Sequence, residues 1–148
     1  MSCLLMVTVL CCAFIYGLAH KVPLVDCGSK LATVHGVDVD PCPKLPCEFK
    51  KNTSVILTIT FTPNRTIDNA TVEFAGSLFW NLFIPYTLQD SNACHRIQCP
   101  IKFGVPVTYT TKLPVYDKMP EVSVTVKGML KMKSTEIVCL ILPVVIIG

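Results

Sequence analysis

Residues 121–133 read EVSVTVKGMLKMK. Apolar residues and one glycine alternate there with mostly polar residues, and this period of two is typical of a β-strand with one buried face. The same alternation recurs in several other parts of the chain, at 34–39, 55–62, 71–78 and 105–110. A last strand is expected after Ile137. The sequence therefore predicts six or seven strands, each apolar on one face.

Such strands need a second sheet to cover their apolar faces. Prolines and asparagines separate the segments, at 40–43, 63–64, 99–100, 113–114 and 119–120. No capped stretch has the period of 3.6 that is typical of a helix, so helices are expected to be absent or short. We expect an all-β fold, an immunoglobulin-like β-sandwich of two antiparallel sheets.

The first nineteen residues have the composition of a secretory leader. They carry no charged side chain, they contain an apolar run at 4–15, and they end in Gly17-Leu18-Ala19, whose small residues suit signal peptidase. We predict a signal peptide at 1–19 and a single mature domain at 20–148. The alternative is a retained membrane anchor, but the segment is short for a span and lacks a basic flank.

Six cysteines remain after the leader, an even number that is typical of a disulfide framework in an oxidising compartment. They are Cys27, Cys42, Cys47, Cys94, Cys99 and Cys139. Two pairs have only four residues between them, which favours local bridges and leaves Cys27 with Cys139. Spacing alone leaves the other pairings open. The leader favours disulfides over zinc for the two close pairs.

Three glycosylation sequons also agree with secretion. They begin at Asn52, Asn64 and Asn69. Because such triplets are common in threonine-rich strands, chance is the alternative explanation.

Composition and motifs exclude several function classes. The 148 residues have a net charge of +3 without a basic cluster, so no nucleic-acid partner is expected. The three histidines are isolated and show no metal-ligand spacing. We therefore predict a protein that is not an enzyme, has no cofactor and no metal, and is a monomer.

Several motifs recur in order along the chain. They are Asp26-Cys27-Gly28, 41–43 with 46–47, Cys99-Pro100-Ile101 and 112–115. In these the chain resembles the MD-2-related lipid-recognition (ML) domain family, in particular its Niemann-Pick type C sterol-transfer and arthropod branches. The resemblance covers the whole mature chain. It implies an immunoglobulin-like sandwich with a lipid between its sheets, and the disulfides Cys27–Cys139, Cys42–Cys47 and Cys94–Cys99.

The resemblance also implies a lipid pocket. Val115 matches the family directly, whereas Tyr86, Met119 and Leu140 stand where the family more often has phenylalanine, tyrosine and tryptophan. These differences leave a fatty acid or another small apolar ligand as an alternative to a sterol. We assign four further inward-facing residues to the same pocket, Phe74, Val107, Tyr109 and Val124.

The inward faces carry no charge, and Gly76 and Gly128 leave space between them. Without the resemblance, these faces favour an ordinary filled core. With it, they favour a cavity.

Residues 78–86 break the alternation with apolar side chains at successive positions. We assign Trp80, Phe83 and Ile84 to the mouth of the pocket, where they would make transient contact with a membrane or a membrane-protein acceptor. The alternative is a strand edge that folds back on the core.

The predicted function is a secreted or lysosomal carrier that binds a sterol and transfers it to membranes or a partner. The alternatives are an extracellular carrier of fatty acids or chemical signals, a module that presents lipid to an innate-immunity receptor, and an adhesion-type sandwich with a filled core.

Overall fold

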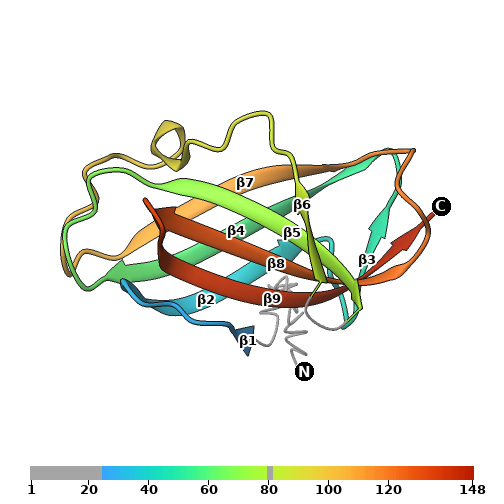
Figure 1. Cartoon of the computed structure of the whole chain (residues 1–148), viewed down its shortest axis with the longest axis horizontal. Helices are drawn as coiled ribbons and strands as arrows, with labels where there is room; N and C mark the ends of the chain where they lie inside the picture. The colour runs from blue at the N-terminus through green and yellow to red at the C-terminus, as the bar shows by residue number, and fades with distance from the viewer. Residues whose placement is uncertain (1–24, 80–81) are drawn as a thin grey trace, which may run out of the picture.

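The computed structural model describes residues 25–79 and 82–148 as two β-sheets that face each other (Figure 1). The predicted all-β sandwich is confirmed. One sheet has the order β1 (Val25–Asp26), β9 (Thr135–Ile147), β8 (Ser123–Met132), β5 (Thr71–Phe79) and β6 (Leu82–Tyr86), and β3 (Cys47–Lys50) pairs in parallel with β9. The other sheet has the order β2 (Ala32–Asp40), β4 (Thr53–Pro63) and β7 (Val107–Val115). The helix η1 (Ala93–His95) is a single 3-10 turn.

Strand β7 differs from its prediction at both ends. It begins at Val107 rather than at Val105, and it continues through Leu113 and Pro114, which we expected to separate strands. Because β7 is an edge strand of its sheet, it tolerates a proline, which lacks the N–H that an interior strand needs.

The segment that breaks the alternation is a β-hairpin. Strands β5 and β6 pair with a register shift between Gly76 and Phe79. A β-bulge interrupts the period of two locally, so the sequence pattern failed to predict β6. Strands β1 and β3 were also missed because they have only two and four residues, too few to show a period.

The core is filled most completely at one end of the sandwich, on the left in Figure 1, where β4 ends and β7 begins. We call this the packed end. Its largest side chains are at most 1% exposed, and they are Phe61, Tyr109, Leu130, Ile137 and Val138. Two connecting segments cover it, since Ile67 and Ile101 form a β-bridge and the Ala93 N–H donates to the Ala70 carbonyl at 2.9 Å.

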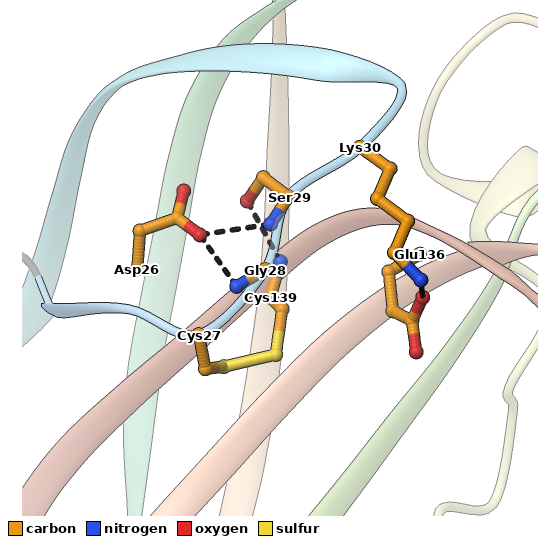
Figure 2. The surroundings of a disulfide bond; sticks show 7 residues. All are labelled: Asp26, Cys27, Gly28, Ser29, Lys30, Glu136 and Cys139. Carbon is orange, nitrogen blue, oxygen red and sulfur yellow. Dashed lines mark hydrogen bonds and ion pairs between the residues drawn. A yellow bond between two sulfur atoms is a disulfide. The ribbon is translucent and has the colours of Figure 1, made fainter.

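A disulfide between Cys27 and Cys139 ties the first strand to the last (Figure 2). Backbone bonds support it, because the Cys27 N–H donates to the Cys139 carbonyl and the Cys139 N–H donates to Ser29 Oγ, both at 3.0 Å. Gly28, between Cys27 and Ser29, has a φ of +126°, a backbone conformation that favours glycine in this turn. Strand β1 is thus fixed to β9, its neighbour in the six-stranded sheet.

The carboxylate of Asp26 organises the same turn (Figure 2). It accepts hydrogen bonds from the backbone N–H groups of Gly28 and Ser29, both at 2.8 Å. Burial alone would raise the pKa of Asp26, but these hydrogen bonds lower it below its usual value. Nearby, an ion pair of 3.0 Å joins Lys30 and Glu136 on the surface.

The other two disulfides are local, Cys42–Cys47 and Cys94–Cys99, each between residues five positions apart. All six cysteines of the described part are therefore paired, in the pairs that the family resemblance implied. The predicted signal peptide at 1–19 lies outside the described residues.

Candidate functional site

A cavity of about 140 Å³ lies between the sheets at the end opposite the packed end. We call this the cavity end; it lies on the right in Figure 1, near β3 and the C-terminus. Strands β3, β5, β6, β7, β8 and β9 all contribute to its wall, and no lining residue is charged. The lining residues are Phe49, Phe74, Ala75, Gly76, Tyr86, Leu113, Pro114, Val115, Met119, Val124, Val126, Val144 and Ile146.

A second cavity, of about 50 Å³, adjoins the first toward the middle of the sandwich. Four residues line both cavities, Phe49, Phe74, Leu113 and Val126. The two cavities thus share part of their walls. A shift of the Phe74 ring would change the space available on both sides.

Gly76 and Gly128 create space, but neighbouring side chains fill it. A Cβ atom at Gly128 would lie 2.8 Å from the Phe74 ring, and one at Gly76 would lie 3.1 Å from Val124 Cγ2. The expectation that both glycines leave open volume is therefore wrong, because the Phe74 ring packs against Gly128 and the Val124 side chain packs against Gly76.

One side chain bridges the edges of the two sheets beside the larger cavity. The Tyr86 hydroxyl on β6 donates a hydrogen bond of 2.9 Å to the Pro114 carbonyl on β7. We call this contact the seam. The Tyr86 ring also stacks on Tyr116, with centroids 6.4 Å apart. Burial and the neighbouring Tyr116 raise the pKa of Tyr86 to about 12, so its hydroxyl remains a donor at neutral pH.

The structure brings together most of the residues assigned to the pocket from the sequence. Five of them line the larger cavity, Phe74, Tyr86, Val115, Met119 and Val124, and Leu140 lines the smaller one. Val107 and Tyr109 line neither cavity of the described part. Both belong to the part of β7 near the packed end, and Tyr109 is 1% exposed within the core.

Eight of the residues that line the larger cavity were not assigned to the pocket from the sequence, and the large apolar ones among them are Phe49, Leu113, Val126, Val144 and Ile146. Val126 belongs to the clearest alternating run, and Leu113 precedes the matched Val115, so a signal existed for both. Phe49 lies on β3, which is too short for a period. Its position depends on the parallel pairing of β3 with the end of β9.

The β5–β6 hairpin carries an exposed apolar surface beside the larger cavity. Its exposed side chains are Leu78, Phe79, Leu82 and Ile84, and Phe79 is 72% exposed. We call this set the apolar hairpin surface. Phe83 is half-buried, and Lys127 Nζ lies 5.4 Å from the centre of its ring. Trp80, also assigned to the mouth, lies outside the described residues.

Neither cavity reaches the roughly 300 Å³ at which small-molecule sites typically begin. A lipid could enter only if the walls move apart. The parts best able to move are the side chains that are half-buried rather than locked in the core, above all Tyr86 and Met119. The structure corresponds to a closed state of the cavity.

The remaining predicted features lie on the surface or concern absences. The sequon asparagines Asn52, Asn64 and Asn69 are all exposed. Within the described ranges, no group of three or more histidine, cysteine or acidic side chains is arranged to hold a metal ion. In the same ranges, no helix has the length and apolar character needed to cross a membrane.

The model of the ML domain matches residues 21–146. The ecdysteroid-regulated 16 kDa protein of Manduca sexta is 39% identical over 80% of this chain and 83% of its own length. The NPC intracellular cholesterol transporter 2 of Mus musculus is 33% identical over 80% of each chain. A solved structure, a Niemann-Pick type C2 protein from the Japanese carpenter ant, superimposes with a TM-score of 0.80 at 21% identity. It covers 85% of this chain and 100% of its own, and it supports the fold.

The predicted family is therefore confirmed by sequence. Its members are lipid carriers rather than enzymes, in agreement with the expectation that the chain has no catalytic site. The chain belongs to the ML domain family.

Proposed function

We propose that this protein binds one lipid molecule between its sheets and carries it through an extracellular or lysosomal fluid. The observation that carries this proposal is the uncharged cavity at the cavity end, beside which Tyr86 bridges the two sheets at the seam. The cholesterol transporter among the relatives supports a sterol as the ligand. The three disulfides support a secretory route, as does the predicted signal peptide at 1–19.

Binding would be driven by desolvation. Each Å² of apolar ligand surface removed from water contributes roughly 25 cal/mol. Part of that free energy would be used to separate the cavity walls and to break the hydrogen bond between Tyr86 and Pro114. The loss of one neutral hydrogen bond costs about 1 kcal/mol, which the burial of a lipid exceeds many times.

Transfer would take place beside the seam. The apolar hairpin surface lies on β5 and β6, the strands that carry Gly76 and Tyr86 of the cavity wall. A membrane or a membrane-protein acceptor that covers Phe79 and Leu82 would remove them from water while the ligand leaves. The glycans expected at Asn52, Asn64 and Asn69 lie outside this hairpin.

The proposal is tested by titrating the secreted protein with dehydroergosterol and with a fluorescent fatty acid. Val124→Phe should fill the cavity and lower the uptake of both probes at least tenfold, because Val124 lines the wall. Val105→Phe is the matched control. It adds the same ring at a position that is 50% exposed and outside both cavities, and it should bind like the unchanged protein.

Val115→Asp provides a second variant, since an unpaired carboxylate in an apolar cavity loses its hydration without compensation. It should bind neither probe. The proposal fails if the unchanged protein binds neither probe, or if a folded Val124→Phe protein binds both with undiminished affinity.

A further inference from the structure

A polar pocket of about 120 Å³ lies on the outer side of the seam. It is bounded by β7 and by the segment that leads from β6 to η1. Tyr86 and Pro114 line both this pocket and the larger apolar cavity. The Tyr86 side chain and the Pro114 carbonyl, which form the seam, therefore belong to a wall that the apolar cavity and the polar pocket share.

Two cationic residues, Arg96 and Lys112, and one acidic residue, Asp90, line the polar pocket. The carboxylate of Asp90 already has partners, because it accepts hydrogen bonds from the Asn92 N–H at 3.0 Å and from His95 Nδ1 at 2.9 Å. Among the residues that the structure describes, neither Arg96 nor Lys112 belongs to an ion pair. The pocket thus offers cationic donors to an anion from outside.

We propose that this polar pocket is the subsite for the carboxylate head of a single-chain lipid whose tail occupies the larger apolar cavity. The inference rests on the proposed function and narrows its ligand class. Arg96 and Lys112 would hold the carboxylate by charge-assisted hydrogen bonds. A sterol hydroxyl can accept a hydrogen bond, but it is neutral and supplies no negative charge to pair with the two cations.

Tyr86 would change partners when such a ligand binds. In the closed state its hydroxyl donates to the Pro114 carbonyl. Rotation of the phenol away from Pro114 would join the two spaces and release the same O–H as a donor. The carboxylate of the bound ligand would then accept the hydrogen bond from Tyr86. The hydrogen bond lost to Pro114 would thus be replaced rather than left unmade.

The test compares oleate with methyl oleate, which has the same tail and no charge. Isothermal titration of the secreted protein should give an affinity for oleate about tenfold higher than for methyl oleate, as expected for charge-assisted hydrogen bonds near solvent. Arg96→Gln/Lys112→Gln should remove that difference by weakening oleate alone. Both side chains are exposed, so we expect this variant to fold.

Arg65→Gln/Lys102→Gln is the matched control, because it removes the same charge from exposed positions outside the pocket. It should retain the preference for oleate. The preference should also shrink as salt is raised, since exposed charges are screened.

The outcomes separate the two proposals. If both probes bind equally well and Arg96→Gln/Lys112→Gln changes neither affinity, the head-group subsite is overturned and the lipid cavity stands. If the unchanged protein binds neither probe and also binds no sterol, the proposed function itself fails, and the subsite with it.

Discussion

The packed end and the cavity end of this sandwich are built from the same alternating strands, yet only one of them is filled. At the packed end the segments 64–70 and 93–101 cover the core and contribute the buried side chains Ile67, Ile97 and Ile101. At the cavity end the cover near the seam consists largely of half-buried Tyr86 and Met119. The comparison indicates that the connecting segments, rather than the strands, determine where this fold is hollow.

The largest expected effect on stability is the loss of the long-range disulfide, compared with the loss of a local one. Replacing Cys27 and Cys139 together with serine opens a loop with a sequence separation of 112 residues and should lower the free energy of unfolding by about 4–5 kcal/mol. Replacing Cys42 and Cys47, five residues apart near the cavity end, should cost about 2 kcal/mol. Chemical denaturation measures both, and equal losses would contradict the loop-closure argument.

Truncation of one large side chain at each end tests the difference in packing directly. Phe61→Ala removes a fully buried ring at the packed end and should cost about 3–5 kcal/mol. Met119→Ala removes a half-buried side chain beside an existing cavity and should cost less than about 2 kcal/mol. Urea denaturation provides the two values, and the comparison breaks down if Met119→Ala is the more costly change.

Enlargement of one valine at each end tests the available space instead. It should destabilise the packed end more than the cavity end. Val138→Phe overpacks a site that is 0% exposed and should cost about 1–3 kcal/mol or prevent folding. Val124→Phe places its ring in the larger cavity and should cost less than about 1 kcal/mol while lipid uptake is lost. Thermal denaturation of the two variants checks the stability side. Similar losses would show that the cavity has no room for a ring.

The smallest expected effect is a pH dependence that arises at the seam. Burial and Tyr116 raise the pKa of Tyr86 from about 10 in the unfolded chain to about 12, so the stabilising contribution of the neutral phenol is complete below pH 10. Between pH 10 and 12 the unfolded state ionises first, and the free energy of unfolding should fall. Tyr86→Phe should flatten this fall.

The measurement is the free energy of unfolding at pH 9, 10 and 11 for both proteins. Some decline should remain in Tyr86→Phe, because burial also raises the pKa of Tyr109 at the packed end. Identical slopes in the two proteins would mean that Tyr86 titrates as an ordinary exposed tyrosine.

Much of the fold was predictable because the signals are local. The alternation at 121–133 predicted β8 and its inward face, and the alternation at 55–62 predicted β4. Strand β6 was not predictable, because the register shift after Gly76 removes the periodicity. Strand β3 was missed for its length, although its pairing with β9 brings Phe49 into both cavities.

Part of the candidate site was predictable for a different reason. Family motifs indicated Val115 and the neighbourhood of Tyr86, which the structure places around the larger cavity. Alternation assigned Tyr109 and Val107 to the same inner face, but it contains no information on position along the strand relative to the connecting segments. For this reason the pattern could not separate residues of the packed end from residues of the cavity end.

The sequence by itself determined the all-β class, the inward faces of β4, β7 and β8 and the family, because periodicity and cysteine motifs are properties of neighbouring residues. Only the tertiary structure decided where the core stays hollow, that Phe74 fills the space over Gly128, and that Tyr86 closes the seam against Pro114. Tyr86 and Pro114 are 28 positions apart in the chain, and Phe74 and Gly128 are 54 positions apart. No local pattern in the sequence specifies that residues so far apart come into contact.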